Sequence, residues 1–283
     1  MTRIVKLLSP ILIFVVIICF PMAGYPQTRR PDVHFEATPQ EVVEAMLKMA
    51  GVNREDVVYD LGCGDGRFVI TAAKAFGARG VGIDIDPVRI KESNENAKNA
   101  GVADRVTFRV GDLFKADIRE ATVVALYLLN ELNLDLRPKL FRELKPRTRI
   151  VSYTFDMSDW EPDNMGKVRG RTFYYWVIPA DISGTWQWSL PSPNDFWQKD
   201  LILQQDFQDI AGRVGFQGRQ FRMREPRLIG NQLSFRLRYN DEGQDVALRF
   251  NGHAHEDTIE GTVDIQGGPR EGTHKWTAKR IKK

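Results

Sequence analysis

The sequence predicts an α/β protein with a doubly wound, mostly parallel sheet, followed by a small antiparallel all-β domain. Two patterns lead to this prediction. Up to about residue 178, short apolar runs alternate with amphipathic stretches, as expected for strands joined by helical crossovers. From about Gly184 onward, apolar and polar residues alternate with a period of two, as in a sheet with one buried face.

The first part of the chain shows the expected elements in order. Thr38, Pro39 and Glu41 predict an N-cap, a first helical residue and a capping-box acid for a helix that ends near Gly51. A long excursion around Trp160 separates the last two predicted strands. The strands are expected at 57–61, 81–85, 106–110, 122–129, 149–155 and 172–178. Three further helices are expected, one ending near 76 and the others at about 87–100 and 135–144.

The second part is predicted to be a β-meander, folded either as a sandwich or as a small barrel. Three alternating runs at 233–239, 246–250 and 259–263 are separated by turn-forming residues rich in Gly, Asn and Asp. Tryptophans are expected to fill the core of this part, and a ligand-binding aromatic cage is the alternative. They are Trp186, Trp188, Trp197 and Trp276.

The most informative segment runs from Asp60 to Phe68 (DLGCGDGRF), where a strand is followed by a glycine-rich turn and a helix N-terminus. Such a turn is the usual cradle of a nucleotide-like ligand. A dinucleotide fingerprint would need glycine where Arg67 stands, and a P-loop would need a following Gly-Lys-Ser/Thr. The remaining pattern, D-x-G-x-G-x-G, resembles motif I of the class I S-adenosylmethionine-dependent methyltransferases. A glycine-rich turn without a ligand is the alternative.

Acidic residues at two further strand ends support this resemblance. Asp84 closes the second strand, where the family's acidic residue takes both ribose hydroxyls of the cofactor, and a carboxylate suits this task because it only accepts hydrogen bonds. Asp86 is the competing candidate, although Pro87 makes it fit the N-cap of the next helix. After the third strand, the resemblance implies that Asp112 accepts from the adenine amino group and that the neighbouring backbone amide reads the ring.

The predicted cofactor is therefore S-adenosyl-L-methionine, bound on a seven-stranded methyltransferase sheet whose last strand is antiparallel. Glycine lets the backbone approach the ligand closely, and acids at the carboxyl ends of parallel strands meet at one edge of the sheet. These acids suit a sulfonium and an α-ammonium and would repel a phosphate. The predicted cofactor-binding residues are Asp60, Gly62, Cys63, Gly64, Gly66, Asp84, Asp112 and Leu113.

The methyl acceptor is indicated by three less general segments, 33–39 (VHFEATP), 65–70 (DGRFVI) and 154–162 (TFDMSDWEP). They resemble a family of bacterial proteins related to the mitochondrial lysine methyltransferases that modify the c-ring protein of the ATP synthase and the adenine nucleotide translocase. That group has an F-x-x-x-x-W-x-P segment after the fifth strand, and Phe155 to Pro162 has the same spacing. The resemblance covers about 33–180 and implies a protein lysine as the acceptor.

Residues beside the cofactor are the candidates for the chemistry. The segment 128–132 (LLNEL) lacks the Asn/Asp-Pro-Pro-Tyr/Phe motif common among enzymes that methylate planar nitrogens, which argues against a nucleic-acid base as acceptor. A lysine must first lose a proton, which desolvation or a nearby sulfonium can favour and a carboxylate or a water molecule can accept. Glu131 and Asp156 are the predicted catalytic residues, and Asn130, Tyr153 and Trp160 are predicted substrate contacts, with helix capping by Asn130 and Glu131 and a core role for Trp160 as alternatives.

Two other functions remain open on the sequence alone. The shared motifs do not specify an acceptor, so a small-molecule O- or N-methyltransferase fits them equally well. A cofactor-binding protein without transfer activity is the second alternative, because export would bring the domain to a compartment where this cofactor is not expected. The sequence offers no metal site, since the four histidines lack ligand spacing.

Composition restricts the partners and the compartment. The chain has 283 residues, of which 42% are apolar, and can hold two domains. The net charge of +3, without any Lys/Arg-rich run, argues against nucleic acid as a partner. The two cysteines, Cys19 and Cys63, provide neither a disulfide framework nor a metal site. In the turn, Cys63 is expected to act as a small residue, and a catalytic thiol is the alternative.

The N-terminal residues resemble a targeting segment. Arg3 and Lys6 precede an apolar stretch from Leu7 to Phe20, which is short for a membrane span and suits a signal peptide, although Met22 and Pro21 make a poor cleavage site. The chain is thus expected to be exported or anchored to a membrane, in an orientation left open. The predicted division is 1–24 signal or anchor, 31–182 methyltransferase domain, and 184–283 β domain.

Overall fold

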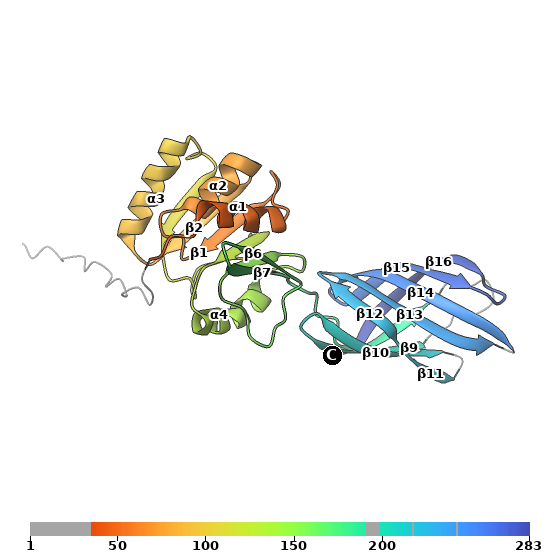
Figure 1. Cartoon of the computed structure of the whole chain (residues 1–283). Helices are drawn as coiled ribbons and strands as arrows, with labels where there is room; N and C mark the ends of the chain where they lie inside the picture. Colours follow the sequence, from red (N-terminus) through yellow and green to blue (C-terminus); the bar gives the residue numbers. More distant parts are fainter. Residues whose placement is uncertain (1–34, 191–198, 217, 242) are drawn as a thin grey trace, which may run out of the picture.

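The computed structural model describes residues 35–190, 199–216, 218–241 and 243–283. The described residues form two sheets that follow one another along the chain, one with helices against it and one without (Figure 1). The predicted leader 1–24 and Trp197 lie outside the described residues. None of the helices in the described part has the length and apolarity that a bilayer span requires.

The first sheet is the expected seven-stranded one. Its strand order is β3-β2-β1-β4-β5-β7-β6. The first five strands are parallel to one another, β7 pairs antiparallel with β5, and β6 pairs antiparallel with β7. The order reverses at β1 and β4, the place where open parallel sheets bind ligands. The strands are β1 (Val57–Leu61), β2 (Arg79–Asp84), β3 (Val106–Val110), β4 (Val123–Leu126), β5 (Arg149–Tyr153), β6 (Asn164–Val168) and β7 (Arg171–Val177).

Helices cover both faces of this sheet, and the alternation along β1 shows why. Val58 packs into the core shared with α1, α2 and α3, whereas Tyr59 and Leu61 pack into the core shared with α4. Successive side chains of a strand point to opposite faces, so a strand that is buried on both sides contributes to two cores at once. The helices are α1 (Gln40–Met49), α2 (Arg67–Phe76), α3 (Pro87–Ala100) and α4 (Asn130–Glu143).

Two predicted helix starts were wrong. Helix α1 begins at Gln40 with Pro39 as N-cap, and no side chain in the described residues caps it. The predicted capping-box acid, Glu41, instead pairs with Arg169 of the β6–β7 turn. Helix α4 begins five residues earlier than expected, at Asn130, because Leu132, Leu136 and Leu140 continue one apolar stripe onto the sheet.

The strand predictions need two corrections in the same region. The expected strand 122–129 is shorter, since β4 ends at Leu126 and the chain then turns into α4. Strand β6 was missed, and the predicted excursion contains it. Its residues Asn164 to Val168 are exposed or half-buried throughout, so they show no apolar alternation. Backbone pairing with β7 alone defines this edge strand.

The C-terminal part, called here the β region (184–283), is the expected antiparallel meander. Its nine strands have the order β11-β10-β9-β8-β16-β15-β14-β13-β12 within the described residues. The amide of Met223, between β11 and β12, donates to the carbonyl oxygen of Gly212 at 3.0 Å and so continues the pairing of β10 with β11 up to the start of β12. The strands are β8 (Gly184–Ser189), β9 (Lys199–Asp206), β10 (Asp209–Phe216), β11 (Arg219–Arg222), β12 (Arg224–Ile229), β13 (Gln232–Asp241), β14 (Gln244–His255), β15 (Thr258–Gln266) and β16 (Gly272–Lys282).

Aromatic side chains fill the core of the β region, as expected. Trp186, Trp188 and Trp276 are all at most 2% exposed, so they cannot form an open cage for a ligand. The ring of Trp276 packs edge-on against Phe250, with ring centroids 5.3 Å apart. Phe235 stacks on Phe250 at 4.5 Å and also meets Trp276 edge-on at 6.2 Å. Such edge-to-face and offset contacts stabilise a core beyond simple burial.

The cores of the two sheets are separate apart from one hairpin. The cores of the first sheet include buried residues from Val42 to Ile178, and that of the β region extends from Ala180 to Ala278. The exception is Phe207, at the turn between β9 and β10, which packs against the α4 core of the first sheet. A domain boundary near residue 182 remains a prediction.

Candidate functional site

A cavity of about 660 Å³ opens at the carboxyl ends of β1, β2, β3 and β4. This is the edge of the sheet where the order reverses. Of the eight predicted cofactor-binding residues, six line the cavity, and Gly64 and Gly66 lie in the turn that forms its floor. The six are Asp60, Gly62, Cys63, Asp84, Asp112 and Leu113.

The turn requires glycine for steric reasons. Gly64 has a φ of +53°, and a Cβ placed on it would lie 2.1 Å from the ring of Phe35. Gly66, the N-cap of α2, has a φ of +79°, and its Cβ would lie 2.7 Å from the ring of Phe108. Side chains are thus excluded by both backbone conformation and packing. The backbone of the turn is left bare where it approaches the cavity.

Asp84 fixes this turn from the neighbouring strand. One carboxylate oxygen accepts from the amide of Gly64 at 2.9 Å, and the other accepts from the amide of Asp86 at 2.9 Å. Asp86 in turn caps α3 by accepting from the amide of Val88 at 2.8 Å, and Pro87 is the first helical residue. The predicted capping role of Asp86 is therefore present, and Asp84 is the carboxylate aimed at the turn.

Asp112 lies just beyond β3. It accepts from the amide of Phe114 at 2.9 Å, which closes a tight turn, and the Lys115 ammonium lies 3.6 Å from its other oxygen. The turn places Leu113 and Phe114 on the wall of the cavity beside Asp112. A flat apolar group with a polar edge suits this corner.

Asp60 is the most perturbed acid of the site. It is 8% exposed. Burial, and after it the charges of Asp84 and Asp65, raise the pKa of Asp60 to about 8. Burial also opposes the ionisation of Asp65, but hydrogen bonds from Arg67 outweigh it and hold the pKa of Asp65 below its usual value. A cationic group in the cavity would favour the ionised form of Asp60.

Cys63 has the surroundings of a packing residue. Burial, with Asp60 and Asp84 nearby, raises the pKa of its thiol far above the usual value. A thiol held neutral is a poor nucleophile, which argues against the catalytic alternative. Opposite Cys63, a Cβ on Gly82 would lie 2.8 Å from its sulfur. A small side chain is what this crowded turn allows.

The apolar part of the cavity lining, called here the apolar wall, was missed by the sequence reasoning. It consists of Phe35, Tyr127, Leu128 and Leu132, with Glu36 among them, and Phe35 and Leu128 pack on the glycine turn. Burial, and after it a hydrogen bond to the Glu36 carboxylate, raise the pKa of Tyr127. Tyr127 directly follows β4, so the strand-end rule that found the three acids would have found it too. Glu36, which precedes the first helix, gave no such signal.

The predicted catalytic and substrate-contact residues are placed differently. None of Glu131, Asp156, Asn130, Tyr153 and Trp160 is among the described residues that line the cavity. The structure does bring Asn130 and Asp156 together: the side-chain amide of Asn130 donates to the carboxylate of Asp156 at 3.2 Å. Glu131 is exposed on the first turn of α4.

The two aromatic candidates are buried beneath the site. Tyr153 is 3% exposed and packs under Tyr127, with ring centroids 4.8 Å apart. Trp160 is fully buried against Phe141 and Trp176. Its position is that of the predicted core alternative, since a side chain without accessible surface cannot touch a substrate.

Known proteins are similar to the part of the chain that builds this cavity. The family model described as the ANTKMT methyltransferase domain matches residues 60–164, which include the glycine turn and the three strand-end acids. A protein-lysine N-methyltransferase of Saccharolobus islandicus is 46% identical over 153 residues, which are 52% of this chain and 95% of that protein. This chain belongs to that methyltransferase family. It is an S-adenosylmethionine-dependent methyltransferase.

Two other proteins are similar to about the same half of the chain. A Homo sapiens protein, named as the lysine N-methyltransferase of the c-ring protein of ATP synthase, is 31% identical over 140 residues, covering 50% of this chain and 59% of the human protein. The crystal structure of an RNA methyltransferase from Salinibacter ruber in complex with S-adenosyl-L-homocysteine is 57% identical, covers 52% of this chain and 96% of its own, and has a TM-score of 0.51.

The cofactor, S-adenosylmethionine, fits the residues of the cavity. Acids line it at three strand ends, which suits the positive sulfonium and ammonium groups. Asp84 and Asp112 would hold the ribose and the adenine, as the family resemblance implied, while the turn at Gly62–Gly66 and Asp60 would face the methionine part. These roles remain predictions for the individual residues.

The role of Asp84 can be tested by its removal. Replacing Asp84 by alanine is expected to weaken binding of S-adenosylmethionine by about 1.5–3 kcal/mol, because charge-assisted hydrogen bonds are lost. Isothermal titration calorimetry would measure this. Asp86→Ala is the comparison at the other acid of this strand end, which also lines the cavity; it should cost α3 about 1 kcal/mol of stability and weaken binding less than Asp84→Ala. A larger loss of affinity in Asp86→Ala would assign the ribose contact to Asp86 instead.

Asp60 predicts a pH-dependent affinity. Its pKa of about 8 means that most Asp60 side chains are protonated at pH 7 in the unliganded protein. A cation binds better to the ionised form, so the affinity for S-adenosylmethionine should increase as the pH rises from about 6 to about 8, and binding should release a proton. Calorimetry at pH 7 in buffers of different ionisation enthalpy measures this release.

Asp60→Asn is the control for this prediction, because it keeps the shape of the side chain and cannot ionise. The variant should bind the cofactor more weakly at pH 8 and lose the increase between about pH 6 and 8. An equal pH dependence in both proteins would contradict the assignment and point to the cofactor's own ammonium group.

Proposed function

We propose that this methyltransferase modifies the side-chain amine of a lysine in a protein. The observation that carries the proposal is the mixed lining of the cavity, which combines strand-end acids for the cofactor with apolar side chains, Tyr127 and Glu36. The Saccharolobus islandicus relative, which matches along 95% of its length, is named a protein-lysine N-methyltransferase, which supports the same acceptor.

The apolar wall addresses the chemical problem of a lysine acceptor. A pH of 7 is about 3.4 units below the pKa of an unperturbed lysine, so deprotonating the ammonium costs about 4.6 kcal/mol. Apolar side chains such as Phe35 and Leu132 disfavour the charged ammonium by excluding water. Bound S-adenosylmethionine supplies a methyl group activated by its sulfonium. The enzyme's own task is then to align a neutral amine with that carbon.

The residues that would receive the proton differ from those expected from the sequence. Glu36 and Tyr127 line the cavity and hydrogen bond to one another, whereas Glu131 and Asp156 do not line it. We therefore assign the proton-accepting role to the Glu36 carboxylate. The Arg171 guanidinium lies 3.8 Å from this carboxylate.

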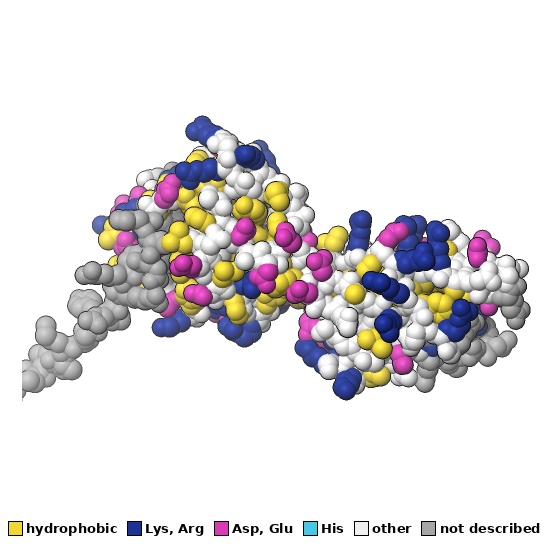
Figure 2. Space-filling model, turned by 60° about the horizontal axis from the view of Figure 1, so that its bottom comes forward, with side chains coloured by type: hydrophobic (Ala, Val, Ile, Leu, Met, Phe, Trp, Pro, Cys, Tyr) yellow, Lys and Arg dark blue, Asp and Glu magenta, His cyan; other side chains and the backbone are white. Residues whose placement is uncertain are grey.

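Surface charge is consistent with a cationic acceptor segment. In Figure 2, Asp and Glu side chains gather over the part of the molecule that carries the first sheet, near its junction with the β region. Lys and Arg side chains dominate the β region in the same view. A lysine-bearing segment would be attracted to the first of these surfaces.

RNA is the second candidate acceptor, because the Salinibacter ruber protein, 57% identical over the shared part, is titled an RNA methyltransferase. The absence of an Asn/Asp-Pro-Pro-Tyr/Phe motif after β4 speaks against methylation of a base. A small-molecule acceptor is the third candidate. Gene deletion distinguishes the three.

Deletion of the gene should remove a 14-Da increment (about one methylene) from a lysine of at least one host protein. Quantitative mass spectrometry of the proteome, membrane proteins included, measures this, and nucleoside analysis of total RNA is carried out in parallel. The wild-type gene should restore the modification, Glu36→Gln should not, and Glu131→Gln should. A methylated nucleoside lost with the gene, and no lost protein modification, would make RNA the acceptor.

We also propose, from the sequence alone, that residues 1–24 bring the enzyme to a membrane or across it. Its apolar stretch from Leu7 to Phe20 lies outside the described residues. Fractionation after alkaline carbonate washing should give either full-length protein in the membrane or a soluble exported species shorter by about 24 residues. Full-length protein in the soluble cytoplasm would contradict both.

A further inference from the structure

The loop that follows β5, residues 155–161, lies beside the apolar wall of the cavity. Its first residue, Phe155, stacks against Tyr127, with ring centroids 6.4 Å apart and an interplanar angle of 26°. Its second residue, Asp156, accepts the hydrogen bond from Asn130 at the start of α4. Tyr127 lines the cavity itself. Contacts that fix this loop therefore fix the wall that faces the acceptor.

Helix α4 holds the loop from one side. The buried amide of Asn133 donates to the carbonyl oxygens of Phe155 and Asp156, at 3.3 and 3.2 Å. One turn later, the Arg137 guanidinium donates to the carbonyl oxygen of Met157 at 2.8 Å. These bonds go to backbone atoms, so they fix the course of the loop whatever its side chains are.

The β9–β10 hairpin of the β region holds the loop from the other side. The side-chain oxygen of Gln208 accepts from the indole N–H of Trp160 at 2.7 Å. The nitrogen of the same amide donates to the carbonyl oxygen of Glu161 at 2.6 Å. Gln208 thus uses both ends of its amide on two successive residues of the loop. Without it, the indole N–H of a fully buried tryptophan would lose its acceptor.

Phe207, the preceding residue, makes the apolar half of this contact. Its ring stacks on Trp160 at 5.8 Å and 21°, lies 5.6 Å from Phe141, and carries the Arg137 guanidinium 5.1 Å from its centroid. Phe207 has a φ of +52°, which is uncommon for a bulky residue. The strained backbone of the hairpin thus places an aromatic ring against the first-sheet part of the chain, called here the catalytic part.

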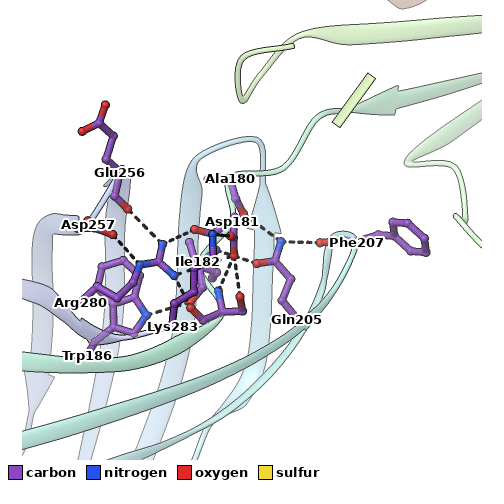
Figure 3. A network of polar contacts seen from close by, with 11 residues as sticks. Ala180, Asp181, Ile182, Trp186, Gln205, Phe207, Glu256, Asp257, Arg280 and Lys283 are labelled. Atoms are coloured by element: carbon purple, nitrogen blue, oxygen red, sulfur yellow. Dashed lines mark hydrogen bonds and ion pairs between the residues drawn. The ribbon is translucent and has the colours of Figure 1, made fainter. Parts of the chain in front are cut away.

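The hairpin is itself tied to the chain that links the two sheets (Figure 3). The Gln205 amide donates to the carbonyl oxygens of Ala180 and Phe207 and accepts from the amide of Ile182, all within 2.9 Å. Arg280, whose side chain is 7% exposed, donates to the carbonyl oxygen of Asp181 at 2.5 Å. The linking residues 180–182 are thus hydrogen bonded to the β region, which restricts how far the hairpin can move relative to the first sheet.

We propose that Phe207 and Gln208 are positioning residues for methyl transfer, through which the β region holds loop 155–161 beside the acceptor. This inference rests on the proposed function, in which the acceptor enters along the wall of Tyr127. The Saccharolobus islandicus relative is matched over 95% of its length by about half of this chain, which leaves too few residues for a β region. The contact is therefore an addition to the shared catalytic part.

Hydrogen exchange read by mass spectrometry on the full-length protein with bound S-adenosylhomocysteine tests the contact. Gln208→Ala should speed amide exchange in 155–161 on the order of tenfold, because the hydrogen bonds of its amide to Trp160 and Glu161 are both lost. Exchange in 57–66 and the affinity for S-adenosylhomocysteine should not change. Gln208→Glu keeps an acceptor for the Trp160 indole and should give an intermediate result.

A second variant separates the contact from folding of the hairpin. Phe207→Gly relieves the strained backbone but removes the ring, so the β region should melt no lower while the loop exchanges faster. Two matched controls should leave the loop unchanged. Gln244→Ala removes an exposed glutamine beside another hairpin turn, and Glu256→Gly places glycine at a hairpin residue with a φ of +50° and an exposed side chain.

Turnover distinguishes positioning from a general structural role. Transfer of labelled methyl groups from S-adenosylmethionine to the total protein of a strain lacking the gene should be slower in Gln208→Ala and Phe207→Gly, at unchanged cofactor affinity. Unchanged loop exchange in both variants, unchanged transfer despite a loosened loop, or an equal loss of cofactor affinity would each overturn the proposal. If the wild-type enzyme labels no protein, the proposed function fails, and the exchange result alone decides whether the β region holds the loop.

Discussion

The hydrogen bond between the carboxylate of Asp84 and the amide of Gly64 joins two neighbouring strand ends, and the rest of the site depends on it. The amides of Gly62 and Cys63 donate to the carbonyl oxygen of Ile83 and hold the first half of the turn on β2. The bond to Asp84 holds the next glycine, and Phe35 and Phe108 pack where side chains on the turn would otherwise lie. A turn of bare backbone then forms the floor of the cavity, with α2 beginning directly behind it.

The electrostatics of the cavity follow from the same geometry. The carboxyl ends of parallel strands meet at one edge, so a sequence with an acid at each end must bring like charges together. Arg67 neutralises Asp65, and backbone amides bind Asp84 and Asp112, but Asp60 is left buried among them. Such an arrangement destabilises the empty site at neutral pH and favours a cationic ligand. The preference for a sulfonium cofactor over a phosphate-bearing one is thus a property of the sheet edge.

The β region relates to this site indirectly. Its own core is filled by tryptophan and phenylalanine, and these rings form no open pocket among the described residues. The β9–β10 hairpin contacts the catalytic part at a loop that α4 also holds, and the turn between β12 and β13 packs against this part as well, with Gly230 beside Arg147. A region added to a catalytic domain can therefore influence the acceptor side without touching the cofactor side. The hairpin contacts the loop that follows β5, whereas the cofactor cavity lies at the ends of β1 to β4 of the same sheet.

The sequence by itself determined the sheet, its strand-end acids and the cofactor, because these depend on local patterns: apolar runs, a glycine turn and an acid after each strand. It also determined the aromatic core of the β region through period-two alternation. It did not determine the edge strand β6, which is paired through its backbone, or the start of α4. Tertiary structure alone decided that Glu36 and Tyr127 face the cavity, that Glu131 and Asp156 do not, and that Trp160 is joined to Gln208. These depend on which distant segments meet, and no local pattern contains that information.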